Sequence, residues 1–296
     1  MGIAVRADSI AIGTGREIWD FRNDRKLAKR LAPAGTYDAC FLPRNLHVSG
    51  DIRIHELAFA GEELWGINTR FSTLCTFDLA HSFIPRWRPP FVTDLAPEDR
   101  CHLNGMAILD GEVRMVTVLG ESNTLSGWRD DKARGGAVID VESGETVLRG
   151  LCMPHSPRFH QGDLWVLESG KGTIARAHLS AGRVETVAEL PGFTRGLAFA
   201  GPYAFVGLSQ IRESNMFGGL PLVERVPERS CGIWVVDLRD GSIVAVLRFE
   251  GIVQEIFDVQ VLHGYRYPQL CLMVAQEVGE TYTIPGTEIT AAMNAS

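Results

Sequence analysis

Hydrophobic and polar residues alternate along most of the chain, and one alternating segment recurs. A copy carries apolar residues at every second position, turns, and continues into a second apolar strand, and four of the six copies start with a polar residue. The copies are MGIAVRADSIAIGTG from Met1, HELAFAGEELWGINT from His55, NGMAILDGEVRMVTV from Asn104, HSPRFHQGDLWVLES from His155, RGLAFAGPYAFVGLS from Arg195, and the shorter FDVQVLHG from Phe257. The last copy fits only the first half of the template before a longer loop leads to the strand LCLMVA. We therefore count six copies.

A second kind of segment follows most copies. It is a hairpin of alternating apolar residues around a turn that contains Gly144, Gly182 or Gly241, where a positive φ costs least. A copy and a hairpin together supply four strands. The copies start 40 to 62 residues apart, close to the roughly 40 to 50 residues of a four-stranded propeller blade. The sequence therefore predicts an all-β, six-bladed β-propeller with four-stranded antiparallel blades, one of them incomplete at the N-terminus. We expect a single domain over residues 1–296, with one weak helix candidate in NDRKLAKRLA.

The first position of each copy indicates where chemistry can occur. In a propeller the innermost strands line a central channel, so equivalent positions on different blades converge there. His55 and His155 hold this position, and His102 lies two residues before Asn104, on the same side of a regular strand. Three imidazoles on one axis predict a site for a divalent metal ion, whose identity is open among zinc, manganese, iron, copper and calcium. The alternative is that these histidines are hydrogen-bonded structural residues.

Charged residues near the same axis indicate the kind of substrate. Arginine guanidinium groups match carboxylates and phosphates, and a carboxylate beside a metal can serve as a ligand or as a general base. The expected substrate-binding residues are Arg158, Asn104, Arg212 and Glu213, and the expected catalytic residues are Arg195, Glu255 and Asp258. The alternative for the arginines is structural, because arginines also tie neighbouring blades together.

Composition excludes several functions and leaves a soluble protein as the expectation. The 29 Lys and Arg against 36 Asp and Glu give a net charge of −7, which disfavours nucleic-acid binding. No apolar run approaches the length of a membrane span, the first residues do not form a signal-peptide core, and the 6 cysteines form no C-x-x-C pair. We expect a cytoplasmic protein with reduced thiols that binds neither membranes nor nucleic acid. Phosphate-binding loops and the G-x-S-x-G motif are also absent from the expected strand-to-helix settings.

Several strings together resemble a known family. GDIRIHELAF, FIPRWRPPFV, DRCHLNGMA, MPHSPR, LPGFTRGLAF and EIFDVQVL are similar to those of a bacterial conserved-hypothetical family, a domain of unknown function with an expected β-propeller fold. The resemblance covers essentially the whole chain. It implies that inner-strand residues precede the MGIA segment in relatives, so that this chain looks shortened at its N-terminus.

The architecture also resembles the six-bladed gluconolactonase or SMP-30-like propellers. That resemblance implies one divalent cation in the channel and lactone hydrolysis, with Glu, two Asn and Asp as ligands. Here the matching places hold Met1, His55, Asn104, His155 and Arg195. Only Asn104 fits that ligand set. A histidine-rich channel is more similar to the seven-bladed polyuronate lyases and carotenoid-type oxygenases.

Two functions from different classes follow. The first is a metal-dependent hydrolase or lyase that acts on a small anionic or polar substrate, such as a sugar acid, a lactone or a modified peptide. The second is a non-catalytic propeller that binds a protein or peptide partner, with Arg86, Trp87 and Arg88 or the loop around Arg212 as its contact face. The sequence leaves the oligomeric state open.

Overall fold

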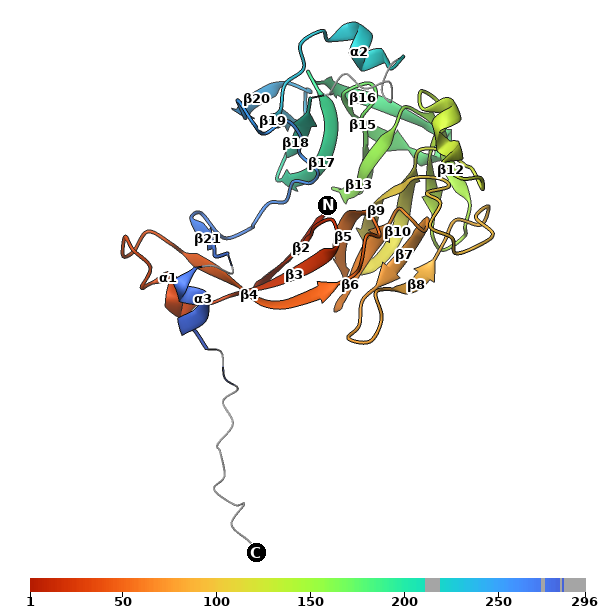
Figure 1. Ribbon diagram of the computed structural model, residues 1–296. Helices are drawn as coiled ribbons and strands as arrows, with labels where there is room; N and C mark the ends of the chain where they lie inside the picture. Colours follow the sequence, from red (N-terminus) through yellow and green to blue (C-terminus); the bar gives the residue numbers. More distant parts are fainter. Residues whose placement is uncertain (211–218, 273–274, 283, 285–296) are drawn as a thin grey trace, which may run out of the picture.

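Five antiparallel sheets stand around a central channel, as the ribbon of the computed structural model shows (Figure 1). The structure describes residues 1–210, 219–272, 275–282 and 284. Each blade consists of four consecutive antiparallel strands, with the first strand innermost, and in blade 1 a further short strand joins the sheet. The strands are, blade by blade, β1 Ile3–Arg6, β2 Ser9–Gly13, β3 Glu17–Asn23 and β4 Ala39–Val48; β5 Ile54–Ala60, β6 Glu63–Asn68, β7 Thr73–Thr76 and β8 Ile84–Trp87; β9 Leu103–Leu109, β10 Glu112–Val118, β11 Gly136–Asp140 and β12 Thr146–Leu151; β13 Pro154–His160, β14 Asp163–Glu168, β15 Thr173–His178 and β16 Arg183–Glu189; β17 Phe193–Ala200, β18 Tyr203–Ser209, β19 Gly232–Asp237 and β20 Ile243–Arg248.

The predicted hairpins are confirmed. β11 and β12, β15 and β16, and β19 and β20 pair antiparallel, and their turns contain Gly144, Gly182 and Gly241 with φ of 74°, 60° and 75°. The helix candidate is a single short helix, α1 (Arg25–Ala28), whose N-terminal N–H groups bond to Asp24. The other helical segments are α2 (Pro221–Arg225), α3 (Gln276–Glu280) and the 3₁₀ turns at Gly127–Asp131 and Leu179–Ala181.

The core lies between neighbouring blades. Trp165 is 4% exposed and packs on blade 4 against Leu197 and Val206 of blade 5. Comparable clusters join blades 1 and 2, blades 2 and 3, and blades 3 and 4. The aromatic residues of the repeated segments are therefore packing residues, because faces of adjacent sheets bury apolar side chains against each other.

The prediction of six blades was wrong, because the structure has five. The copy from Phe257 forms no strand over residues 257–262. A strand needs a hydrogen-bonded neighbour, and of the expected strand LCLMVA (residues 270–275) only Leu270 belongs to a described strand. β21 (Pro268–Leu270) pairs instead in parallel with β4, which makes the sheet of blade 1 five-stranded. The four-stranded antiparallel blades and the all-β class are confirmed.

Residues 254–262, which we call the bridging segment, run between blade 5 and blade 1. The N–H of Gln210 at the end of β18 donates to the carbonyl of Gln254 over 2.9 Å. At the other side, the N–H of Ile3 in β1 donates to Oδ2 of Asp258 over 2.8 Å. The segment therefore closes the ring of inner strands without contributing a blade of its own.

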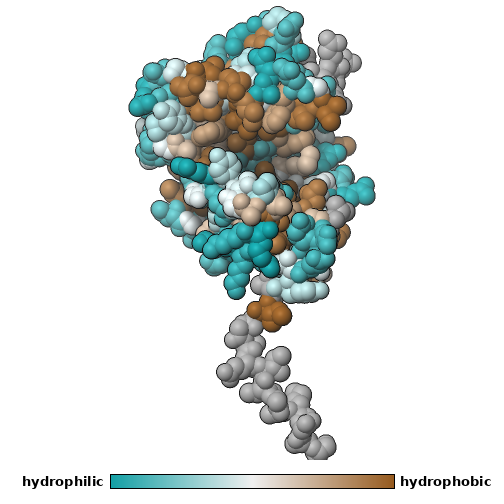
Figure 2. Space-filling view, turned by 90° about the vertical axis from the view of Figure 1, so that its left-hand side faces the viewer, coloured by the Kyte–Doolittle hydropathy of each residue, from teal (hydrophilic) through white to brown (hydrophobic). Residues whose placement is uncertain are grey.

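The faces of blades 5 and 1 toward the bridging segment are less covered than the other blade faces. Phe205, which corresponds in the repeat to Trp165, is only partly buried, and Leu247 on the same face of blade 5 is 56% exposed. On blade 1, Trp19 is partly buried, with Leu262 and Tyr265 packed in the same cluster. Figure 2, which looks onto this side of the molecule, shows hydrophobic side chains gathered around a hollow.

The C-terminal part of the described chain packs on the outer strand of blade 1. α1 and α3 lie beside β4 in Figure 1, and Cys40 and Cys271 bring their Sγ atoms to 3.5 Å within one buried cluster. All six cysteines are free thiols. Across the described residues, no helix combines the length and the hydrophobicity needed to span a membrane.

Candidate functional site at the channel mouth

The inner strands of blades 2 to 5 depart from regular pairing near the start of the repeat. Their registers shift between Ile54 and Leu57, at Asn104, between His155 and Arg158, and between Thr194 and Leu197. Such bulges redirect side chains and are common beside active sites. They allow successive residues to face the channel at different depths.

Three of these strands are also entered through a left-handed residue. Arg53, His102 and Met153 have φ of 54°, 50° and 51°, and each precedes the first repeat position by two residues. Non-glycine residues rarely adopt this conformation. His102 therefore reaches the channel from a strained turn before β9, and not by the strand alternation expected from the sequence.

The structure brings the three histidines together in one cavity of about 550 Å³, which we call the channel-mouth pocket. The ring centres of His55 and His102 are 4.7 Å apart, and those of His55 and His155 are 6.4 Å apart. Arg195 and Glu255 line the same pocket.

Hydrogen bonds fix the tautomer of His55. The hydroxyl of Thr69 donates its only proton to the carbonyl of Leu103 over 2.6 Å, so Nδ1 of His55, 2.7 Å from that hydroxyl, is the donor. Nε2 of His55 then has no proton, and no hydrogen bond engages it within the described part of the chain.

His155 and His102 are held in the same way. Nδ1 of His155 lies 2.9 Å from the carbonyl of Met153 and 2.9 Å from Oγ of Ser169, and that hydroxyl donates to the carbonyl of Thr194. Nδ1 of His102 lies 3.0 Å from the carboxylate of Asp99. Metal-binding histidines commonly donate one ring N–H to such partners and bind through the other nitrogen.

Burial keeps two of these rings neutral. It lowers the pKa of His55 and of His155 well below 6.5, and the nearby positive charge of Arg195 lowers both further. A neutral imidazole is the form that binds a metal ion.

Arg195 is the unpaired cation of the pocket. Its guanidinium carbon lies 4.8 Å from the ring centre of Phe257, and no hydrogen bond or ion pair joins it to any described residue. Burial lowers the pKa of Arg195 to about 10, and the carboxylates of Glu255 and Asp258 oppose that change. The group stays charged at neutral pH, and its donors are available to an anion.

Arg158 lies deeper, in a buried ion-pair network below the pocket. Its Nη1 bonds to Glu56 and to the carbonyls of Met106 and Pro157, and its Nη2 is 3.8 Å from Asp258. Arg158 therefore links blade 4 to blades 2 and 3 and to the bridging segment. The structure does not bring it into the channel-mouth pocket, and this arrangement corresponds to the structural alternative for the arginines.

Glu56 is a central acid that the sequence analysis missed. Its side chain is 4% exposed, and burial raises its pKa to about 7, against the lowering effect of Arg158. A signal for it was present in the second position of the six copies. That position reads Gly2, Glu56, Gly105, Ser156, Gly196 and Asp258, which alternates glycine with a polar residue.

The structure explains this alternation. The side chains of Glu56, Ser156 and Asp258 accept hydrogen bonds from the N–H groups of Met106, Gly196 and Ile3 on the next inner strand. The glycines at this position leave room for the backbone of the following inner segment; a Cβ on Gly196 would lie 2.5 Å from the backbone nitrogen of Val259. Asp258 is thus a contact between the bridging segment and blade 1, and burial raises its pKa.

Asn104, also predicted, does not line the pocket. Oδ1 of Asn104 accepts a bond of 2.6 Å from Thr117, and its buried Nδ2 has no partner among the described residues. Asn104 borders the polar space around Glu56 and Asp258, below the mouth. Arg212 and Glu213 lie outside the described residues.

The pocket contains residues that the sequence analysis did not single out. Trp128 packs against His102 with ring centres 4.3 Å apart, and Asp99 holds both His102 and Arg53. Trp128 comes from the loop between β10 and β11, outside the repeated segment, so the repeat register could not identify it.

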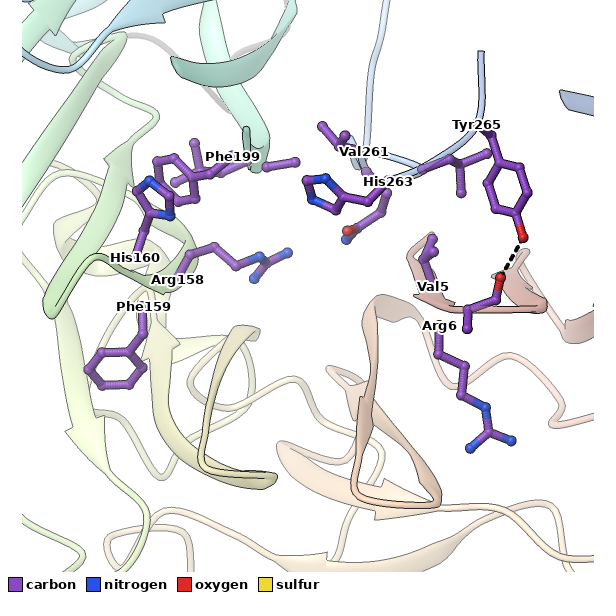
Figure 3. Close-up of a pocket in the computed structure, with 14 residues that line it drawn as sticks. Val5, Arg6, Arg158, Phe159, His160, Phe199, Val261, His263 and Tyr265 are labelled. Carbon is purple, nitrogen blue, oxygen red and sulfur yellow. Dashed lines mark hydrogen bonds between the residues drawn. The ribbon is translucent and has the colours of Figure 1, made fainter. Parts of the chain in front are cut away.

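A second cavity of about 390 Å³ lies at the opposite end of the channel (Figure 3). His160 stacks on Phe199 there, with ring centres 4.2 Å apart, and the hydroxyl of Tyr265 donates to the carbonyl of Ala7. Arg158 points into this space from the left of the view. Because the charge of Arg158 is already compensated by Glu56 and Asp258, the channel-mouth pocket is the stronger candidate site.

The histidines do not form a closed metal site as they stand. Within the part of the chain that the structure describes, no three His, Cys, Asp or Glu side chains lie close enough to hold a metal ion. Two imidazoles on one metal have ring centres about 4.5 to 5.3 Å apart, given metal–nitrogen bonds of about 2.1 Å. The spacing of His55 and His102 falls in this range, and that of His55 and His155 exceeds it.

Comparisons with known proteins identify the family without a function. No curated protein matches the chain. Among solved structures, the WD40 domain of Neurospora crassa Pan2 is similar, with 13% identity and a TM-score of 0.45 over 84% of this chain and 65% of that one. The computationally designed Ika8 protein is similar with 12% identity and a TM-score of 0.43 over 88% of this chain and 64% of that one. This chain thus spans less than two thirds of either structure. A family model matches residues 1–271, and the protein therefore belongs to the family described as domain of unknown function DUF4915.

Proposed function

We propose that the protein is a metal-dependent enzyme of the hydrolase or lyase type that acts on a small anionic substrate in the channel-mouth pocket. The observation that carries the proposal is the shared state of His55, His102 and His155. Each ring is held through Nδ1, and each leaves Nε2 without a partner among the described residues at one cavity. Metal-ligating histidines commonly donate one ring N–H to such partners and leave the other nitrogen for the metal.

A divalent metal ion on these Nε2 atoms would supply Lewis acidity toward a substrate carbonyl or carboxyl group. Binding requires His155 to move toward His55, because the spacing of their ring centres, 6.4 Å, is too wide for a shared metal ion. The left-handed Met153 and the bulge after His155 place this ring on irregular backbone, which can shift more readily than a regular ladder.

The surrounding residues hold the substrate and move protons. Arg195 binds the anionic group of the substrate with its free guanidinium donors. Glu255 lines the pocket, is exposed, and is the carboxylate best placed to act as general base. Asp258 is not assigned that task, because its carboxylate oxygens accept from the N–H groups of Ile3 and Val259.

The second candidate is a non-catalytic propeller whose channel binds a small anionic ligand or a peptide. The absence of a ready three-ligand group among the described residues favours it. The contact face suggested by the sequence gains less support, since Arg86 pairs with Glu63 and stacks on Trp65, and Trp87 packs between blades 2 and 3.

Metal content and stability distinguish the two. Protein purified without a metal-affinity tag is expected to contain close to one transition-metal ion per chain, and chelation is expected to lower its melting temperature. His155→Ala should abolish the bound metal and the effect of chelation on the melting temperature. His160→Ala, a change at the opposite cavity, should preserve both properties. Metal-free protein whose stability does not respond to zinc, manganese or iron would overturn the proposal in favour of the binding propeller.

A further inference from the structure

One wall of the channel-mouth pocket is hydrophobic. Leu119, Trp128, Met153 and Phe193 line it, and they are 1%, 5%, 5% and 8% exposed. They belong to a single hydrophobic cluster formed by the mouth loops of blades 3, 4 and 5. The side chains of this wall pack against one another and offer a ligand almost no hydrogen-bonding groups.

The rest of the pocket lining is polar. Arg53 and Arg195 line the pocket together with Asp99 and Glu255, while Arg129 stacks on Trp128 of the hydrophobic wall. Arg53 is paired with Asp99 over 3.3 Å, whereas no hydrogen bond or ion pair joins Arg195 to a described residue.

The hydrophobic wall contains one polar group, the indole N–H of Trp128. It is buried and has no hydrogen-bond partner among the described residues.

We infer that the ligand of this pocket is a hydrophobic carboxylate, with its anionic group on Arg195 and an acyl or aromatic group against Leu119, Met153 and Phe193. This inference rests on the proposed function and specifies its substrate class. A sugar acid fits less well, because several hydroxyl groups would lose water against this wall without gaining partners. A cavity of about 550 Å³ accommodates a carboxylate with a tail of this kind.

Calorimetric titrations with three matched probes test the inference on the protein as purified. Octanoate is expected to bind at least tenfold more tightly than gluconate, which keeps the carboxylate but carries hydroxyls. Octanoate should also bind more tightly than octanamide, which keeps the tail but lacks the charge.

Variants locate the binding. Arg195→Gln should remove the preference for octanoate over octanamide. Met153→Gln should lower the affinity for octanoate and leave the affinity for gluconate unchanged. Phe159→Leu, in the cavity at the opposite end, should leave all three affinities unchanged. The inference would be overturned if gluconate bound more tightly than octanoate. It would also be overturned if neither Arg195→Gln nor Met153→Gln changed the affinity for octanoate.

The metal content of each sample separates this result from the proposed function. A metal-containing protein that prefers gluconate would retain the enzyme proposal and exclude the hydrophobic carboxylate. A metal-free protein that binds octanoate through Arg195 would retain the ligand class and exclude the metalloenzyme.

Discussion

At the residue scale, small sets of hydrogen bonds decide what each polar side chain can do. Thr69, Asp99 and Ser169 hold three imidazoles in one tautomer, while Arg195 keeps its donors free of any described partner. Arg158 carries the same chemical group as Arg195, yet Glu56 and two backbone carbonyls occupy it. Residue type alone therefore does not distinguish a binding arginine from a structural one.

Glu56 provides a pH-dependent prediction at this scale. Its pKa is about 7 in the folded protein and 4.5 for a glutamate exposed to water in the unfolded chain, so between these values the folded state holds a proton that the unfolded state has lost. The contribution of Glu56 to the free energy of unfolding should therefore fall as pH rises from 4.5 to 7. The full shift corresponds to about 3 kcal/mol.

Glu56→Gln should remove this dependence. Denaturant unfolding at about pH 5, 6.5 and 8 should show the wild type losing stability relative to the variant as pH rises. His55 and His155 titrate in both proteins, so their effects cancel in the difference. Glu62→Gln, at a side chain that is 94% exposed, is the control and should give a flat difference. Parallel curves for Glu56→Gln and wild type would contradict the assignment.

At the element scale, the bulged inner strands and the bridging segment position the site. The glycines of the second repeat position admit the backbone of the following inner segment. The polar residues of that position each accept a hydrogen bond from an N–H group of the following inner strand. The bridging segment takes part in the same pattern through Asp258. It therefore acts as an inner strand in position and contacts, although it forms no ladder.

Two glycine variants test the packing of the bridging segment against β17. Gly196 and Gly201 both have positive φ, of 80° and 56°, so alanine strains the backbone at each. A Cβ at Gly201 would meet nothing within 4 Å, whereas one at Gly196 would meet the backbone of Val259 and Asp258. We expect Gly196→Ala to reduce the free energy of unfolding by about 2 kcal/mol or more beyond the loss in Gly201→Ala. Equal losses in thermal or denaturant unfolding would show that the bridging segment is not packed against β17.

At the scale of the whole molecule, the repeat predicted most of the architecture. The inner strands from Ile54 to Ala200 and the hairpins around Gly144, Gly182 and Gly241 were predicted because alternation and turn residues are local signals. The prediction of a sixth blade was wrong, because the local pattern from Phe257 does not show whether a partner strand exists. β21 pairs with β4, more than 200 residues earlier in the chain, and nothing in either segment alone indicates that pairing.

The candidate site was predictable only in part. The convergence of His55 and His155 follows from the repeat register, since inner strands meet at the channel, whereas His102 reaches it from the turn before β9. Their depth relative to Glu56, Arg158 and Asn104 depends on bulges and left-handed residues that alternation does not reveal. Trp128 lies outside the repeat, in a loop whose position depends on tertiary packing.

The most direct test of the central claim is an anomalous-difference map from crystals of the protein grown with zinc, recorded above and below the zinc absorption edge. If the three histidines bind a metal ion, we expect one strong peak at the channel mouth, within about 2.0 to 2.3 Å of Nε2 of His55, His102 and His155. Crystals with no peak at the channel mouth, or with Nε2 of these rings bonded only to protein or water, would contradict it.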